Sequence, residues 1–425
     1  MGCSKNLIDS ERLKRRLETK GYEVAHNPIE PDGEYVVVNT CGFIGDAKEE
    51  SVMMLLNLAE LKEEGKIGKL VVMGCLSERY RGSLDDEIPE IDLFYGKFDW
   101  DGFVEELPDR INIPKKPKNW ERSLTTPSHS AYLKISEGCN RFCAFCAIPL
   151  ITGHYKSRPI EEIIEEVESL VKRGVKEFNV IAQDLSSYGI DIYGKHELAR
   201  LIDTMAEIPG IEWIRLHYAY PADFPLDVLD VMARRTNVCK YLDIALQHIS
   251  DSQLSAMRRH ITKEETISLL NTIREKVPGI KIRTTLMVGF PGETEDDFEE
   301  LMDFVRTQRF DRMGAFAYSE EEDTFAANHL KDNVPADIKQ ERLDRLMALQ
   351  EEISDELNST MIGSKVRLLV DEADNGRLLC RSQWDSPDVD LSYTVESGDA
   401  QPGDFIEAVV TEALPFDFIA EQLNN

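Results

Sequence analysis

The chain has 425 residues and carries 49 basic against 79 acidic side chains, a net charge of −30. Its length predicts two or three domains, and its hydrophobic share of 42% is sufficient for folded cores. No apolar run approaches the ~20 residues that span a bilayer, and no signal peptide is visible, so we expect a cytoplasmic protein without a membrane partner. The acidity disfavours polyanionic partners, although a local basic patch can still bind nucleic acid.

Residues 1–112 alternate between helical and strand patterns, which predicts a doubly wound parallel α/β domain. Helices are expected over 6–22 and 47–66, and short apolar strands over 34–41, 69–75 and 91–96. Ligand sites in this architecture lie just beyond the carboxyl ends of the strands, where Cys41 and Cys75 stand. Cys3 precedes the first helix, but the strand that should lead into it is missing. Either the chain start is truncated or misassigned, or this domain is built differently.

A second domain is expected over 125–357, after a linker at 111–130 that is rich in proline and lysine. Within it a strand-then-helix rhythm repeats six times, and one long helix over 335–357 follows. The six strands are expected at 130–135, 177–182, 212–218, 241–246, 281–288 and 312–318. Six units are too few for a closed eight-stranded barrel. The pattern therefore predicts an open, partial (β/α)6 barrel whose chemistry lies at the carboxyl ends of its strands.

The tail over 358–425 reads as short alternating strands with glycine and proline turns, which predicts a small antiparallel β-barrel. It contains four basic and thirteen acidic residues, so its net charge is 4 − 13 = −9. Such a surface is suited to a basic protein partner better than to RNA, because neutralisation of phosphates dominates RNA affinity.

Three of the eight cysteines, Cys139, Cys143 and Cys146, form a Cys-x-x-x-Cys-x-x-Cys pattern directly after the first strand of the predicted barrel. Three thiolates on one tight loop can hold three irons of a 4Fe–4S cluster and leave the fourth iron open. The alternative is a structural zinc site. Zinc favours four ligands on paired knuckles, and no second knuckle is present here.

Cys3, Cys41 and Cys75 are too far apart in sequence for a local metal knuckle, yet each occupies the position of a βα loop. A second three-cysteine 4Fe–4S cluster at one edge of the sheet is the sharper hypothesis. Three separate buried cysteines are the alternative, since free cysteine is often buried. Acylation of Gly2 and Cys3 fits poorly, because the motif requires serine or threonine where the chain has Asn6. Cys239 and Cys380 are expected to be structural.

The cysteine spacing on the first strand of a partial barrel resembles the radical S-adenosylmethionine (radical SAM) superfamily. The resemblance implies that the open iron chelates S-adenosylmethionine and that reductive cleavage yields a radical that abstracts hydrogen. Phe145 matches the family position near the adenine, with core packing as the alternative. Gln183 and Asp184 are candidates to hold the amino group. Arg215 and Gln247 are candidates for the ribose or carboxylate; each of these four can instead be a structural residue at the barrel rim. No general base is assigned.

The whole chain resembles the methylthiotransferases of this superfamily, which combine an N-terminal three-cysteine domain, a radical barrel and a substrate-recognising TRAM-like β-barrel. This resemblance implies two 4Fe–4S clusters, with S-adenosylmethionine as both methyl donor and radical source. The stretches "GCSKNLIDSERL", "RLHYAYP", "LDIALQHISDSQLSAMRR", "YSEEEDTFA" and "CRSQWDSPDVD" resemble the branch that modifies the β-carbon of an aspartate in small-subunit ribosomal protein twelve. Asp323 departs from the pattern, because glycine is expected there.

Two alternatives remain open at this point. The other branch of the family methylthiolates a modified adenosine in transfer RNA, but it usually shows a Gln-Ser-Gly-Ser-like stretch where this chain has 247–250, "QHIS". A non-catalytic, metal-stabilised ribosome- or RNA-binding module is an alternative of another class. The expected partners are a basic ribosomal protein and an electron donor such as flavodoxin or ferredoxin; transfer RNA is not expected.

Overall fold

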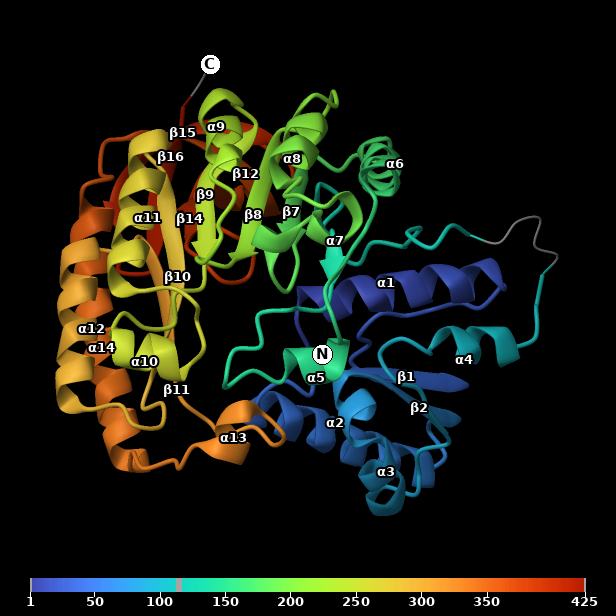
Figure 1. Cartoon of the computed structure of the whole chain (residues 1–425). Helices are drawn as coiled ribbons and strands as arrows, with labels where there is room; N and C mark the ends of the chain where they lie inside the picture. The colour runs from blue at the N-terminus through green and yellow to red at the C-terminus, as the bar shows by residue number, and fades with distance from the viewer. Residues whose placement is uncertain (1, 112–116, 424–425) are drawn as a thin grey trace.

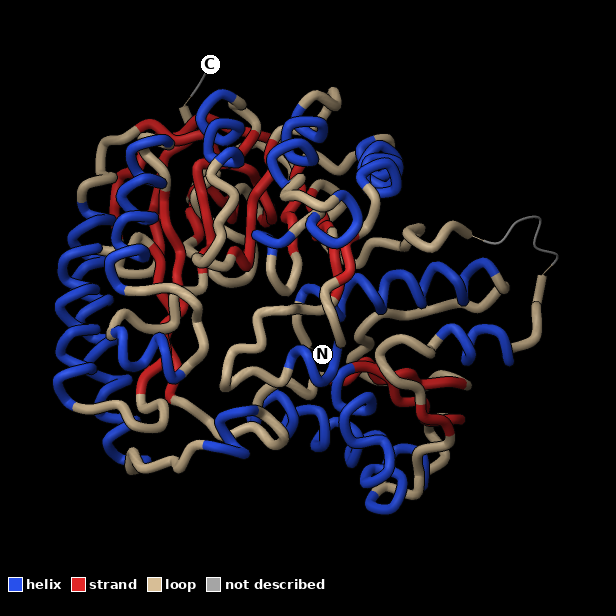
Figure 2. Tube along the Cα trace, in the orientation of Figure 1, coloured by secondary structure: helices blue, strands red, loops and turns tan. Residues whose placement is uncertain are grey.

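A computed structural model describes residues 2–111 and 117–423 of the chain (Figure 1). Part of the predicted linker, residues 112–116, lies outside the described residues. Figure 2 shows a large group of strands flanked by helices and a separate, smaller group of strands among other helices. Within the described residues, every helix is too short or too polar to span a bilayer.

The N-terminal region contains a three-stranded parallel sheet in the order β1-β2-β3, with helices on both faces. Its elements are α1 (Ser4–Thr19), β1 (Tyr35–Thr40), α2 (Gly45–Glu63), β2 (Lys69–Gly74), α3 (Cys75–Glu87), β3 (Leu93–Phe94) and α4 (Asp101–Glu106). Leu55 of α2 and Leu84 of α3 pack on one face of the sheet, while Leu13 of α1 and Phe103 of α4 pack on the other. The doubly wound parallel arrangement is therefore confirmed. No strand precedes α1 among the described residues, and the helix begins directly after Cys3.

The central region is an open sheet of six parallel strands in the order β11-β10-β9-β8-β7-β4, which confirms the partial barrel. Its strands are β4 (Ser130–Lys134), β7 (Glu177–Ile181), β8 (Trp213–Ala219), β9 (Val238–Ile244), β10 (Lys281–Val288) and β11 (Arg312–Ala317). The covering helices are α6 (Ile160–Val171), α8 (Leu198–Ala206), α9 (Asp227–Arg234), α11 (Lys263–Lys276), α12 (Glu295–Gln308) and α14 (Ala336–Ser359). The smaller elements are β5 (Ser136–Glu137), α5 (Ile148–Thr152), β6 (Lys156–Ser157), the 3-10 helix η1 (Leu185–Ser187), α7 (Ile190–Tyr193), α10 (Asp251–Ala256) and α13 (Phe325–His329).

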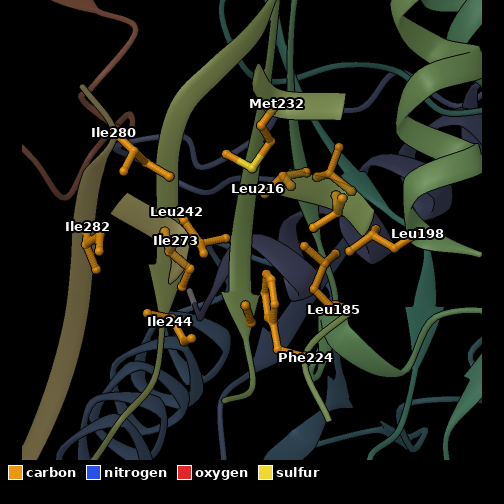
Figure 3. Close-up of a cluster of buried hydrophobic side chains, with 14 of the residues drawn as sticks. Leu185, Leu198, Leu216, Phe224, Met232, Leu242, Ile244, Ile273, Ile280 and Ile282 are labelled. Atoms are coloured by element: carbon orange, nitrogen blue, oxygen red, sulfur yellow. The ribbon is translucent and has the colours of Figure 1, made fainter. Parts of the chain in front are cut away.

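The outer face of this sheet is apolar and its inner face is polar, because side chains alternate along each strand. Leu216 of β8 and Leu242 of β9 belong to the core beneath the helices, together with Ile273 of α11 (Figure 3). Their strand neighbours Arg215 and Asp243 are buried on the other side, inside the barrel. Local signals agree with this packing: α11 and α12 each begin with a capping box, which satisfies backbone N–H groups that the helix leaves unpaired.

The C-terminal region is a closed five-stranded barrel in the order β12-β13-β14-β16-β15. Its strands are β12 (Lys365–Asp374), β13 (Arg377–Ser382), β14 (Ser392–Val395), β15 (Phe405–Ala413) and β16 (Asp417–Gln422). The expectation of a wholly antiparallel barrel was wrong at one pair, since β14 and β16 are parallel. The reason is geometric: directions cannot alternate around a closed ring with an odd number of strands, so one neighbouring pair must be parallel.

Buried ion pairs join the first two regions. Arg122 pairs with Glu11 of α1 at 2.5 Å and with Glu166 of α6 at 2.8 Å, and all three side chains are almost fully buried. At the far side, Glu321 accepts from Lys48 at 2.8 Å and from Arg79 at 2.9 Å. The neighbouring Asp323 adopts φ +62°, the left-handed conformation in which the sequence pattern expected glycine. The first two regions therefore hold a defined position relative to each other.

Candidate active site

The loop that contains Cys139, Cys143 and Cys146 lies between β5 and α5, beyond the carboxyl end of β4. The Cys139 N–H donates to the Gly153 carbonyl at 3.2 Å, and the Cys146 N–H donates to the Cys143 carbonyl at 3.0 Å. Gly138 precedes the loop with φ +79°, and a side chain there would lie 2.2 Å from the His154 carbonyl. Glycine is therefore required where the chain enters the cysteine loop.

The three thiols of this loop, which we call the barrel triad, share one electrostatic environment. Burial raises the pKa of Cys139 to about 12, and the charges of Asp184 and Cys143 raise it further. Burial and the neighbouring Cys143 and Cys139 also raise the pKa of Cys146. Thiols that oppose one another's ionisation in this way lie close together. A bound cationic cluster removes that opposition, because it stabilises all three thiolates at once.

Two side chains that the sequence reasoning missed contact the barrel triad. Arg259 donates from Nη1 to the Cys143 Sγ at 3.2 Å, and the Tyr220 Oη lies 3.8 Å from the same sulfur. The Tyr220 hydroxyl also donates to the Arg259 carbonyl at 2.7 Å. Tyr220 lies within the "RLHYAYP" stretch that had carried the family resemblance, so its sequence signal was present without an assigned role.

Cys3, Cys41 and Cys75, which we call the N-terminal triad, gather at the carboxyl edge of the three-stranded sheet. Cys41 follows β1 and Cys75 begins α3 directly after β2. Because Thr40 stands opposite Gly74 in the parallel register, the residues that follow them are neighbours.

Cys3 reaches this edge without a strand of its own. Asn6, in the first turn of α1, donates from Nδ2 to the Thr40 carbonyl at 3.1 Å. Its Oδ1 lies 3.6 Å from the Cys75 Sγ, and its own carbonyl accepts from the Asn39 amide at 2.8 Å. The first turn of α1 is therefore attached by side-chain hydrogen bonds to the ends of β1 and β2. These hydrogen bonds hold the chain next to Cys3 in the place where a leading strand was expected.

The thiols of the N-terminal triad also affect one another's ionisation. Burial raises the pKa of Cys75 to about 11, with Cys3 and Cys41 raising it and Lys97 lowering it. Burial raises the pKa of Cys41, and the charge of Cys3 adds to the effect. For Cys3 burial also acts to raise the pKa, but the ammonium of Lys5 and nearby backbone N–H groups outweigh it and lower the pKa. The three thiols therefore form a second close group.

The donor sets of both triads fit iron–sulfur clusters. All eight cysteines are free thiols. Among the described residues, no three cysteine, histidine or carboxylate side chains are arranged around one point as a single metal ion requires. A 4Fe–4S cluster does not require this, because each thiolate binds a different iron. Cys239 and Cys380 lie in hydrophobic cores away from both triads, as expected for structural residues.

Gln183 and Gln247 lie beyond the strand ends of the barrel with their amide oxygens buried. Neither oxygen has a hydrogen-bond partner among the described residues, although the Gln183 amide nitrogen donates to Glu137. Gln247 also adopts φ +72°, a conformation that costs energy for a residue with a side chain. Buried acceptors without donors are unfavourable by ~1–3 kcal/mol, so both positions fit a ligand that brings amino or hydroxyl groups.

Phe145 and Asp184 are engaged with the protein itself. Phe145 is half-buried and packs edge-on against Phe290, with ring centroids 6.3 Å apart, which agrees with the core-packing alternative. Asp184 accepts from the Arg141 Nε at 2.7 Å and from the Ser186 N–H at 2.9 Å, and so caps the short helix η1. Both lie at the cysteine loop, but Asp184 already has strong donors.

Arg215 does not lie at the cysteine loop. Its fully buried guanidinium pairs with Glu177 at the beginning of β7, donates to Asn179 at 2.9 Å and donates to the Ser382 carbonyl of the C-terminal barrel at 3.1 Å. Arg215 is the third residue of β8, far from the carboxyl end of that strand. Instead of the cofactor contact expected from the sequence, its guanidinium forms a structural ion pair. Sequence spacing did not reveal this, because the partner residue Ser382 is 167 positions away.

The two triads approach each other, because Cys75 of the N-terminal triad packs with Ala147, which directly follows Cys146 of the barrel triad. Asp9 of α1 accepts from Lys97 at 3.1 Å and from Lys134 at the end of β4 at 2.6 Å. Lys134 also donates to Glu137 at 2.8 Å, just before the barrel triad. This buried chain of charges connects the domain of one triad to the strand that leads into the other.

Comparison with family models divides the chain into three matched segments. The Radical SAM superfamily model matches residues 133–305, the model described as Uncharacterized protein family UPF0004 matches residues 1–96, and the TRAM domain model matches residues 362–423. The N-terminal triad lies in the second of these segments and the barrel triad in the first.

Several curated proteins are similar over nearly the full length. Ribosomal protein uS12 methylthiotransferase RimO of Bacteroides fragilis is 56% identical over 99% of this chain and 97% of its own length. The protein of the same name from Flavobacterium johnsoniae is 48% identical over 99% of this chain and 96% of its own length.

Among solved structures, the radical S-adenosylmethionine methyltransferase TsrM from Kitasatospora setae superimposes with a TM-score of 0.54. It is 17% identical, and the match covers 74% of this chain and 70% of TsrM. This likeness concerns the fold alone.

Proposed function

We propose a function for a chain that belongs to the radical SAM family of ribosomal protein uS12 methylthiotransferases. In this proposal it replaces a β-carbon hydrogen of an aspartate in uS12 with a methylthio group. Full-length identity to the curated relatives supports this reaction and this substrate. The observation that carries the proposal in the structure is the approach of two three-cysteine groups, since Cys75 of one packs with Ala147, which directly follows Cys146 of the other.

Each triad is proposed to hold one 4Fe–4S cluster, and the barrel triad leaves an iron open for S-adenosylmethionine. When bound, the clusters and S-adenosylmethionine supply the radical that removes hydrogen, the sulfur and the methyl group. The chain's own residues prepare this chemistry. Arg259 and Tyr220 place positive charge and a hydroxyl beside Cys143, where they stabilise thiolate charge. The Gln183 and Gln247 amide oxygens accept hydrogen bonds from the cofactor.

The division of labour between domains is part of the proposal. Residues 1–112 carry the auxiliary cluster, residues 125–357 form the radical SAM core with its trailing helix, and residues 358–425 form the TRAM-like barrel that recognises the substrate. The charge of −9 on the last segment supports binding of a basic ribosomal protein. A ribosomal substrate also implies a cytoplasmic location, and the reaction requires an electron donor such as flavodoxin or ferredoxin.

Anaerobic reconstitution tests the two-cluster arrangement. We expect about eight irons per chain, and about four in either Cys41→Ala or Cys143→Ala, since each 4Fe–4S cluster contributes four. Cys239→Ala is the matched control, because it removes a buried cysteine outside both triads and should leave the iron content unchanged. Fewer than about six irons in the wild-type protein would contradict two clusters. Absence of 5′-deoxyadenosine after reduction with S-adenosylmethionine would contradict the radical mechanism.

Mass spectrometry of uS12 and of transfer RNA from a deletion strain tests the substrate. We expect uS12 to lose its methylthio group and to regain it when the wild-type gene, but not the Cys41→Ala gene, is restored. A normal uS12 with a missing transfer RNA modification would assign the chain to the other branch. If both substrates are normal, the chain acts as a binding module rather than an enzyme.

A further inference from the structure

The target side chain sets a requirement for the site. In an aspartate the reacting β-carbon is bonded directly to a carboxylate. Bringing this group between the two cysteine triads removes part of the water from a full negative charge, which is costly unless a cation or several donors replace the water. The site therefore needs a cation that is not already neutralised by the protein's own carboxylates.

Most cations around the two triads have such partners. Arg141 pairs with Asp184, Lys134 and Lys97 pair with Asp9, and Arg283 pairs with Asp390. In the central region Arg259 donates to the Cys143 thiol and Arg258 lies over the Phe325 ring. Lys5, beside Cys3, likewise has no carboxylate of the described residues within 4 Å of its ammonium. Its Nζ lies instead 3.2 Å from the centroid of the Tyr218 ring. An aromatic ring positions a cation without cancelling its charge, so Lys5 stays available to an anion.

Lys5 reaches from the N-terminal triad to the barrel. It follows Cys3 by two residues on the first turn of α1, while Tyr218 is near the carboxyl end of β8 in the barrel. The charge of Lys5 also reaches the barrel interior, where it acts on the pKa values of His217 and Asp243. A group that bound to Lys5 would thus be adjacent to the N-terminal triad and would face the open side of the barrel.

The protein holds Tyr218 in a strained conformation that presents the ring to Lys5. Tyr218 has φ +62°, and the register between β8 and β9 shifts between Leu216 and Ala219. The Asp243 carboxylate accepts the Tyr218 N–H at 3.3 Å and so supports the bulge. Such strain in a non-glycine residue is unfavourable by ~1–3 kcal/mol and clusters at functional sites. Tyr218 is 37% exposed as a residue, so the Lys5–Tyr218 pair lies at an accessible place.

We propose that the Lys5 ammonium, positioned on the Tyr218 ring, binds the carboxylate of the target aspartate and determines the preference for an acidic side chain. The inference rests on the proposed function, because it assumes that an aspartate enters this site. Lys5 is a specificity-determining residue in this account: it touches the substrate carboxylate and orients the β-carbon, while the hydrogen is removed elsewhere in the site.

The test is a double-mutant cycle between enzyme and substrate, with the anaerobically reconstituted holoenzyme. Wild type, Lys5→Met, Lys5→Arg and Lys69→Met are each measured with uS12 and with a uS12 variant in which the target aspartate is asparagine. Lys69→Met is the matched control, since Lys69 also lies over a tyrosine ring, that of Tyr35 at 6.0 Å, but at the end of β2 opposite Cys75. Binding is measured by fluorescence anisotropy, and methylthiolation of the aspartate substrate by kcat and KM.

We expect wild type to bind the aspartate substrate about 10- to 100-fold more tightly than the asparagine variant, as for loss of one charge-assisted hydrogen bond. Lys5→Met should bind both equally, Lys5→Arg should retain part of the preference, and Lys69→Met should behave as wild type. Iron content and substrate-free cleavage of S-adenosylmethionine should not change in Lys69→Met. If Lys5→Met loses iron, the binding preference of wild type and of Lys5→Arg for the aspartate over the asparagine substrate still tests the role of Lys5.

Two outcomes distinguish a failure of the Lys5 inference from a failure of the proposed function. If wild type methylthiolates uS12 but binds both substrates equally, or if Lys5→Met keeps the preference, the role of Lys5 is wrong and the proposed function stands. If wild type neither binds nor modifies uS12, the proposed function is wrong and the inference falls with it.

Discussion

Replacing Glu177 with glutamine should release the C-terminal barrel from the radical core. Glu177 begins β7 and is fully buried. Its Oε2 accepts from the Arg381 Nη2 at 2.8 Å, its Oε1 accepts from the Arg381 Nη1 at 2.9 Å, and Oε1 also accepts from Arg215. Arg381 is on β13, so this one carboxylate joins two regions and neutralises part of two buried guanidinium charges.

The magnitude follows from what glutamine would leave behind. Removing one partner of a buried ion pair costs about 3–5 kcal/mol, because the remaining charge is buried without compensation. Burial alone would raise the pKa of Glu177, but Arg381 and Arg215 lower it well below its ordinary value of 4.5. Since the folded-state pKa is the lower one, this stability is present above pH ~4.5 and is lost as the pH falls below that value. The difference between wild type and Glu177→Gln should shrink correspondingly in acid.

Urea unfolding of the apoprotein and hydrogen exchange in β12 and β13 measure this effect. Glu212→Gln is the control, because Glu212 also reaches the C-terminal barrel, through Arg367 at 2.7 Å, but both side chains are more than 40% exposed. An exposed pair contributes about 0–1 kcal/mol, so the control should change little. The reasoning would be refuted if Glu177→Gln and Glu212→Gln lowered stability equally, or if exchange in β13 did not increase.

Three further predictions concern the triads, the pH response and the domain interface. Gly74→Ala should lower the iron content from about eight to about four per chain. The reason is that a Cβ at this position, with φ +105°, would lie 2.4 Å from the Asn39 Oδ1 and displace the start of α3. An unchanged iron content would contradict this. Burial lowers the pKa of His248 to about 4 from 6.5, so in urea unfolding the stability of wild type relative to His248→Gln should be about 2 kcal/mol lower at pH ~5 than at pH ~7.5; an equal difference at both pH values would contradict this. Glu321→Gln removes the carboxylate between Lys48 and Arg79. Methylthiolation should fall about tenfold or more, while iron content and 5′-deoxyadenosine formation persist. Equal loss of all three would indicate general unfolding instead.

Much of the fold was readable from local pattern. All six strands of the open barrel and all three strands of the N-terminal sheet occur where apolar runs predicted them, because hydrophobic periodicity and turn residues act over a few neighbouring positions. The barrel triad was readable for the same reason, since its three cysteines share one short loop. The long helix α14 and the closed C-terminal barrel likewise occupy the predicted segments.

Other features depend on distant residues and had no local signal. Arg215 looked available at the barrel, but its charge is engaged by Glu177 and by a carbonyl of the C-terminal barrel. The role of Asn6 in holding Cys3 near Cys75 had no sequence signal, since 69 positions separate Asn6 from Cys75. The parallel pair in the last barrel followed from ring closure, which no single strand encodes.

Lys5 and Cys3 show what can be predicted from the sequence and what depends on the tertiary structure. The sequence by itself determined that Cys3 precedes a helix and that two other cysteines follow strands. Only the tertiary structure decided that the first turn of α1 is attached to β1 and β2 and that the Lys5 ammonium lies on the Tyr218 ring. The physical reason is that elements form from local preferences, whereas the partner of each side chain is chosen by the packing of elements far apart in the chain.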